Sequence, residues 1–195
     1  MAGETEKKND PEEIIPVSPS GSGDAQDVIP KVLPVLPLSD VVLFPSMVAP
    51  LVGTTAKSIR LIDNVVSGNR FLVTVLQKNR AAQDDELTLK DVYEYGCVAR
   101  LIKMLKFPDE TVRVLVQGIS RCRIVRAQEN KHFLEAHYAA LKDEIEDSVE
   151  VSALLRNASQ RFQEIITLSP ALPEELKIAV FNIEDPGKLT DLIAS

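Results

Sequence analysis

The sequence predicts an α+β fold, in which a barrel-like domain of mixed strands with one crossover helix precedes the start of an α-helical bundle. Between residues 32 and 143 the apolar residues fall in short β-rich runs broken by turn residues, with one helical stretch among them. After Asp147 the apolar spacing changes to that of helices. The chain therefore divides into a β-rich domain, residues 32–143, and the beginning of a helical subdomain, residues 147–195.

Residues 1–31 precede the domain and have the composition of a disordered tail. They hold seven acidic and three basic side chains, four prolines and the small-residue run Ser20–Gly23. A segment with few apolar residues and a net charge buries too little surface to offset the entropy of ordering. We expect this acidic tail, rich in Pro, Ser and Gly, to be disordered.

The first β-rich segment, residues 33–51, is interrupted by four prolines: Pro34, Pro37, Pro45 and Pro50. Proline has no N–H to donate to a ladder and cannot continue a helix. The segment is therefore predicted to form edge strands, bends and an extended connection rather than a central strand.

The crossover helix follows this segment. Thr54 or Thr55 can cap its start, and Gly68 can end it in the left-handed conformation. The residues between them place four apolar side chains on one helical face: Ile59, Ile62, Val65 and Val66.

Further strands are predicted after the helix. Residues 71–76 form a continuous apolar run typical of a buried strand. Residues 98–107 and 112–117 read as a hairpin closed near Pro108, and residues 122–127 and 133–141 as a second hairpin.

Three helices are predicted at the end of the chain. The first carries apolar residues at helical spacing from Val151 to Ile166, the second has Pro173 in its first turn, and the third opens at Asp185. The third reaches Ser195 without a helix-stop signal. We therefore expect the chain to be a fragment of a longer protein.

No catalytic, cofactor or metal site is predicted in this chain. The single Gly-Lys pair lacks the other residues of a phosphate-binding loop. His132 and His137, five residues apart, fall on opposite faces of a strand. Cys97 and Cys122 lie in apolar runs and are expected to be small buried hydrophobes.

The charge and hydropathy of the chain also limit its partners. The net charge of −7, with basic residues scattered, argues against nucleic-acid binding. No apolar run approaches the roughly 20 residues of a membrane span, and the acidic amino terminus is unlike a signal peptide. The sequence predicts a cytoplasmic protein that does not bind membranes.

Several segments resemble the amino-terminal domain of the ATP-dependent protease Lon, at the spacing that Lon uses. They are the proline-rich segment with the residues after it (33–59), and residues 95–101, 104–109, 112–118 and 182–186. The resemblance extends from Lys31 to Ser195. It implies a PUA-like pseudobarrel, and it implies that ATP, magnesium and the Ser–Lys dyad belong to domains outside this chain.

The resemblance also predicts the function. We expect a substrate-recruiting and oligomer-supporting region of a hexameric Lon-type serine protease that degrades misfolded and regulatory proteins. Its partners would be unfolded or damaged proteins and further copies of the protease. The alternative is a stand-alone Lon-domain binding module or adaptor without ATPase or protease activity.

Large apolar residues at the predicted bends are the candidate substrate-binding surface. Flexible methionines and aromatic side chains suit the binding of many different unfolded chains. The alternative is that they fill the core of the small barrel. The candidate residues are Phe44, Met47, Val48, Met104, Phe107 and Pro108.

Overall fold

The computed structural model describes residues 13–14, 29–79, 87–108, 111–128, 130 and 132–195. The chain forms two compact units, residues 1–141 and 142–195. The prediction of disorder for residues 1–31 falls outside the described residues, except at positions 13–14 and 29–31.

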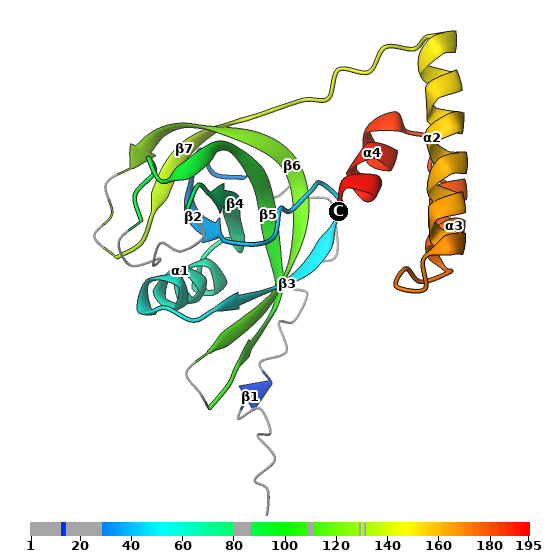
Figure 1. The fold of residues 1–195 in the computed structure, drawn as a ribbon. Coiled ribbons are helices and arrows are strands. Elements are labelled where there is room, and N and C mark those ends of the chain that lie inside the picture. The colour runs from blue at the N-terminus through cyan, green and yellow to red at the C-terminus, as the bar shows by residue number, and fades with distance from the viewer. Residues whose placement is uncertain (1–12, 15–28, 80–86, 109–110, 129, 131) are drawn as a thin grey trace, which may run out of the picture. The chain divides into compact units, whose positions relative to one another are not determined.

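The first unit is a seven-stranded mixed sheet with one helix (Figure 1). Its elements are β1 (Glu13–Ile14), β2 (Val32–Leu38), β3 (Val48–Gly53), α1 (Ala56–Ser67), β4 (Phe71–Gln77), β5 (Val92–Lys106), β6 (Val112–Gln128) and β7 (Glu135–Ala140). The strands lie in the order β1-β5-β4-β2-β7-β6-β3, and β5 also pairs with β6. Since β5 pairs with both β4 and β6, the sheet curves back on itself as a pseudobarrel.

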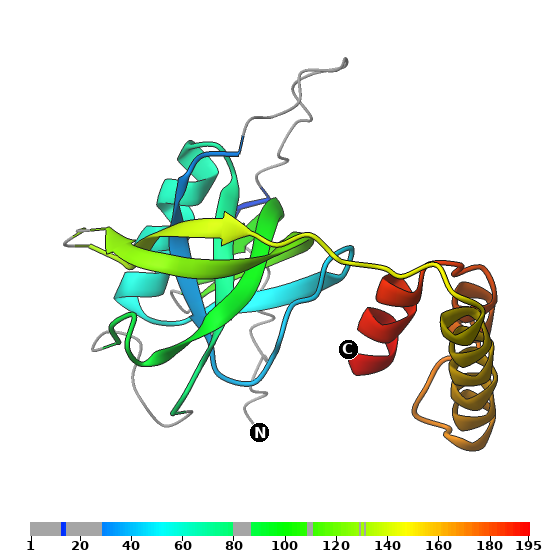
Figure 2. The same ribbon diagram turned by 90° about the horizontal axis from the view of Figure 1, so that it is seen from above.

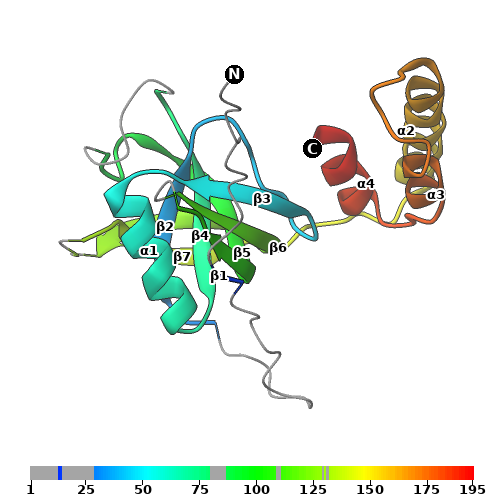
Figure 3. The same ribbon diagram turned by 90° about the horizontal axis from the view of Figure 1, so that it is seen from below.

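The connection from β2 to β4 contains the predicted crossover helix. β2 and β4 are parallel, whereas the other strand pairs are antiparallel. A parallel pair needs a long crossover, and α1 lies within it, packed against the sheet (Figure 3). The predicted α+β class, with a pseudobarrel and one crossover helix, is confirmed.

The core of this unit consists of two clusters of buried apolar side chains. One cluster joins α1 to the sheet through residues such as Leu61, Ile62 and Leu101. The other lies among β2, β4, β5, β6 and β7 and includes Val35 and Val73. β4 contributes to both clusters because its successive side chains point to opposite faces, which confirms the prediction of a buried strand.

β2 corrects the prediction that prolines keep this segment out of the interior of the sheet. β2 lies between β4 and β7. Its first half, Val32 through Pro34, pairs with β7, and its second half, Val35 through Leu38, pairs with β4. Each proline therefore pairs with only one neighbouring strand: Pro34 with β7 and Pro37 with β4. The missing N–H of each proline interrupts no ladder on its other side. Pro50 fits the prediction, because β3 is at the edge of the sheet.

The boundaries of α1 confirm one sequence expectation and correct another. Thr55 is the N-cap, and its side chain and that of Ser58 form a reciprocal capping box. Gly68 ends the helix with a φ of −100°, which is not left-handed. The positive φ lies two residues later, at Arg70, with a value of 65°.

Both predicted hairpins are present, with longer strands than expected. β5 starts at Val92 rather than at residue 98, and β6 continues through Gly118 as one strand that serves both hairpins. Figure 2 shows β6 and β7 side by side along the second hairpin. Gly118 is a point of close approach to the Phe44 carbonyl within this strand.

The second unit contains the three predicted helices: α2 (Val149–Leu168), α3 (Leu176–Phe181) and α4 (Pro186–Ala194). α3 begins at Leu176, after Pro173 rather than with it. Asp185 caps α4 by accepting a hydrogen bond from the Lys188 amide at 3.1 Å. Ile166, Val180 and Leu189 form the small core of this unit.

Candidate functional site

The loop between β2 and β3 turns sharply at its end. Residues 44–47 form a β-turn in which the Met47 amide donates to the Phe44 carbonyl at 3.2 Å. Pro45 takes the second position, and Ser46 takes the third with a φ of 65°. This is the pattern of a type II turn, whose third position favours glycine.

Gly118 of β6 fixes this turn to the sheet. Its carbonyl accepts from the Ser46 amide at 2.9 Å, and its amide donates to the Met47 carbonyl at 2.8 Å. A Cβ at position 118 would overlap the Phe44 carbonyl oxygen and lie 2.9 Å from the Phe44 carbonyl carbon. The absence of a side chain therefore lets the loop backbone lie directly against β6.

The loop held in this way forms one wall of an apolar pocket of about 370 Å³. The remaining walls come from β4, β5, β6 and the residue after β7. The pocket lies wholly within the first unit. Its lining residues are Leu38, Val41, Val42, Leu43, Phe44, Pro45, Thr74, Val75, Leu76, Tyr93, Tyr95, Gly96, Arg121, Cys122 and Leu141.

Large apolar side chains at the rim of the pocket are exposed to solvent. Tyr93 and Tyr95 alternate with Glu94 along β5, so they share one face of the strand, and they are 49% and 62% exposed. Val41 and Val42 of the loop are 40% and 49% exposed. A contiguous apolar patch of this kind is a mark of a binding surface.

The floor of the pocket is closely packed and chemically inert. Gly96 brings β5 against β4, because a Cβ there would overlap the Thr74 carbonyl oxygen. The Thr74 hydroxyl donates to the Cys97 carbonyl at 3.2 Å. Burial, with a smaller contribution from Cys97, raises the pKa of the Cys122 thiol to about 12. Cys122 is therefore protonated at neutral pH and is no nucleophile.

The predicted binding residues from the proline-rich segment lie in three different settings. Phe44 lines the pocket. Met47 is partly buried and packs against the core cluster beneath α1. Val48 is 48% exposed on the edge strand β3.

The predicted residues near the first hairpin are divided between core and surface. Met104 is 3% exposed within the core, so the expectation that it is displayed is wrong. The Met104 side chain lies on the inner face of β5. The sequence alone does not show which residues of this strand face inward. Phe107 is partly buried, with the Arg113 guanidinium 4.5 Å from its ring centroid, and Pro108 is exposed. A substrate-binding role for the displayed residues stays a prediction.

Most residues that form the pocket rim were not predicted from sequence: Val41, Val42, Tyr93, Tyr95 and Leu141. The alternation Tyr93-Glu94-Tyr95 was a signal for a strand with one aromatic face. The predicted strand begins at residue 98, so it does not include this alternation.

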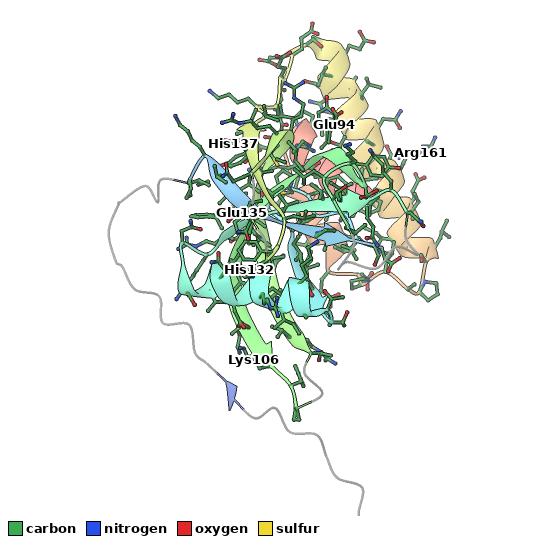
Figure 4. The ribbon with its side chains drawn as sticks, turned by 90° about the vertical axis from the view of Figure 1, so that its left-hand side faces the viewer. Glu94, Lys106, His132, Glu135, His137 and Arg161 are labelled. Atoms are coloured by element: carbon green, nitrogen blue, oxygen red, sulfur yellow. The ribbon has the colours of Figure 1, made fainter. Side chains whose placement is uncertain are left out.

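The prediction that the two histidines occupy opposite faces of one strand is wrong, because His137 lies in β7 whereas His132 precedes that strand. Figure 4 shows His132 and His137 apart, with Glu135 labelled between them. His137 Nε2 lies 3.2 Å from both Arg126 Nη2 and Gln128 Oε1. Within the described residues, no three His, Cys, Asp or Glu side chains gather as metal ligands. No helix in the described part of the chain is long and apolar enough to span a membrane.

The first unit is thus a mixed-strand pseudobarrel with an open apolar pocket. The family model described as the ATP-dependent protease La (LON) substrate-binding domain matches residues 32–195. The chain therefore belongs to the Lon substrate-binding domain family.

Individual relatives agree with this assignment. The chain is 38% identical over 166 residues to the Lon protease of Dictyoglomus thermophilum, which covers 85% of this chain and 21% of the relative. It is 40% identical over 162 residues to the Lon protease of Azospirillum brasilense, which covers 83% of this chain and 20% of the relative. The chain thus spans about a fifth of the length of these curated relatives.

A solved structure supports the fold. The N-terminal domain of Mycobacterium avium complex Lon protease superposes with a TM-score of 0.67 at 20% identity, and the match covers 83% of this chain and 81% of that one.

Proposed function

We propose that this chain recruits protein substrates for a Lon-type ATP-dependent serine protease. The pocket beside Tyr95 binds exposed apolar side chains of unfolded or damaged proteins and holds them near the parts of the protease that use ATP and cut peptide bonds. The observation that carries this proposal is the apolar pocket with its exposed rim. ATP, magnesium and the catalytic dyad are contributed by other domains of the protease, which acts on misfolded and regulatory proteins in the cytoplasm.

A pocket of this size holds one or two side chains, so binding at one copy is weak. Oligomerisation offsets this weakness, because several linked copies raise the effective concentration of a second contact once the first has formed. We propose a hexamer, with this region supporting assembly as well as capture. Nucleic acid and membranes are not partners of this region in the proposal.

The competing function is a stand-alone adaptor that binds the same apolar segments without any ATPase or protease partner. The two functions share the pocket and differ in what the binding leads to. Mixing the chain with a Lon protease that lacks its own amino-terminal domain separates them. Restored degradation only when the chain is covalently joined to the protease supports recruitment in cis, whereas restoration by the separate chain supports an adaptor.

The pocket itself is tested by matched surface variants. Tyr95→Ser and Val42→Ser remove apolar area from the rim, and Val52→Ser removes it from β3, where Val52 is 57% exposed and lines no part of the pocket. Binding of a fluorescent unfolded substrate should weaken about three- to tenfold in the two rim variants, since each loses buried apolar contact. Equal affinities in all three variants would place recruitment elsewhere.

A further inference from the structure

β3 leaves one side of its backbone uncovered. The strand is last in the sheet order and pairs with β6 on one side. Among the described residues, no strand pairs with its other side. An open strand edge presents free N–H and C=O groups, to which another extended chain can add. The features of β3 that resist such addition therefore decide whether the first unit stays a closed sheet.

The register identifies the β3 residues whose backbone groups point outward. Met47 lies opposite Gly118, one step beyond the pair of Val48 and Gln117, and its carbonyl accepts from the Gly118 amide at 2.8 Å. Ladder hydrogen bonds in an antiparallel pair fall on alternate residues of a strand. Alternate residues from Val48 onward therefore direct their N and C=O groups away from β6: Val48, Pro50 and Val52.

Pro50 occupies the middle of this outward row. It has no N–H, and its ring fills the space through which a partner carbonyl would approach. A strand added to this edge could bond to Val48 and Val52 but would lose the donor between them. Because the nitrogen of Pro50 points outward, its missing N–H removes no hydrogen bond to β6.

β3 lacks the charged residues that protect many edge strands. Its sequence, Val-Ala-Pro-Leu-Val-Gly, has no charged side chain. Val48 and Val52 are 48% and 57% exposed, so an added strand would also find apolar contact. The charged residue Arg113 of β6 lies opposite Val52, but its guanidinium is 4.5 Å from the Phe107 ring centroid. Protection of this edge therefore falls to the proline.

We infer that Pro50 closes the β3 edge to strand addition by a second copy of this chain. The pairing of β3 carries this inference, which does not depend on the proposed function. A region that gathers unfolded proteins has particular need of a closed edge. Unfolded segments bring unpaired backbone groups to high local concentration, and an open apolar edge is then the starting point for aggregation.

Amide hydrogen exchange of the unmodified chain tests the edge itself. The Ala49 and Leu51 amides point toward β6 and should exchange slowly. The Val48 and Val52 amides point outward and should exchange about tenfold faster or more, because no strand covers them. Slow exchange at Val48 and Val52 would mean that the edge is already covered, which overturns the inference.

Two variants at position 50 test the proline. Pro50→Val and Pro50→Lys both restore the outward N–H, but valine favours strand pairing whereas lysine places a charge on the edge. Sedimentation velocity over a concentration series should show Pro50→Val associating about tenfold more tightly than the unmodified chain. The Val48 and Val52 amides of this variant should become protected as it associates. Pro50→Lys should sediment as the unmodified chain does.

Two results would contradict the role of Pro50. If Pro50→Val associates no more tightly than the unmodified chain while Ala49 and Leu51 stay protected, the proline does not close the edge. If Pro50→Val and Pro50→Lys associate equally, the contact is not strand pairing. A failure of Pro50→Val to fold would appear as lost protection at Ala49 and Leu51, and Pro50→Thr, also β-branched, then takes its place.

Discussion

Gly118 is the residue on which the architecture of the pocket depends most directly. It has backbone hydrogen bonds to Ser46 and Met47 of the loop and leaves no room for a methyl group beside Phe44. Gly118→Ala must push the loop backbone away from β6. We expect a loss of roughly 2–4 kcal/mol in the free energy of unfolding, measured by urea denaturation.

Gly53→Ala is the control for this prediction. A Cβ at position 53 meets only side-chain atoms, the nearest being Ile62 Cδ1 at 2.8 Å, which is the flexible end of its side chain. Gly53→Ala should therefore lower the free energy of unfolding by less than Gly118→Ala does. Equal costs for the two variants would show that the close approach of the loop at Phe44 is not a special constraint.

Cys122 gives the protein a pH dependence at alkaline pH. Burial raises the pKa of its thiol from 9.0 to about 12. Between these values the unfolded chain loses a proton that the folded chain keeps, so the unfolded state is favoured as pH rises. The free energy of unfolding should fall by about 1.4 kcal/mol per pH unit above pH 9 from this group.

Denaturation at a series of pH values measures this slope, and Cys122→Ala should reduce it by the contribution of one group. Thiol labelling provides a second measure. At pH 8 the folded protein should resist a thiol reagent at Cys122 until denaturant is added. Rapid labelling of Cys122 under native conditions would mean that the pocket floor is open to solvent.

At the scale of elements, α1 offers a matched pair of threonines at its start. Thr55 accepts a hydrogen bond from the Ser58 amide at 3.1 Å, whereas Thr54 is exposed and takes no part in the cap. Thr55→Ala should cost about 1 kcal/mol of unfolding free energy. Thermal or urea denaturation of Thr54→Ala should show almost no change. The reverse ranking would assign the cap to the other threonine.

Much of the fold followed from local patterns in the sequence. The apolar face of α1, the continuous run of β4 and the Asp185-Pro186 start of α4 are decided by residues close together in the chain. β2 was misread because the rule against proline in central strands assumes a partner on both sides of each residue. β2 exchanges β7 for β4 at Pro34, and this exchange depends on strands up to a hundred residues away.

The candidate site was predicted only in part, for a similar reason. The proline-rich segment drew attention to the loop, and Phe44 does line the pocket. Whether a large apolar residue is displayed or buried depends on strand register. Met104 and Ile102 are two residues apart on β5, yet Met104 is 3% exposed and Ile102 is 39% exposed. The register shift of β5 between Leu101 and Lys103 separates them, and nothing in the local sequence marks it.

At the scale of the whole molecule, each unit has its own core. The first unit contains the pocket, and the second has a core of few residues and exposes large side chains such as Phe181, at 79%. Apolar exposure alone therefore does not identify the recruiting surface. Phe181 also borders a cavity, but that cavity is lined by Arg156, Glu184 and several serine and glutamine side chains, whereas the cavity of the first unit has, among the described residues, one charged lining residue, Arg121.

Amide chemical-shift mapping of the 21.5 kDa chain during titration with an unfolded model substrate shows directly whether substrate binds at the pocket. We predict that the largest shifts fall on the pocket segments: residues 41–45, 93–96, 121–123 and 141. Shifts confined to the hairpin around Phe107 or to the helical unit, with the pocket segments unchanged, would contradict it.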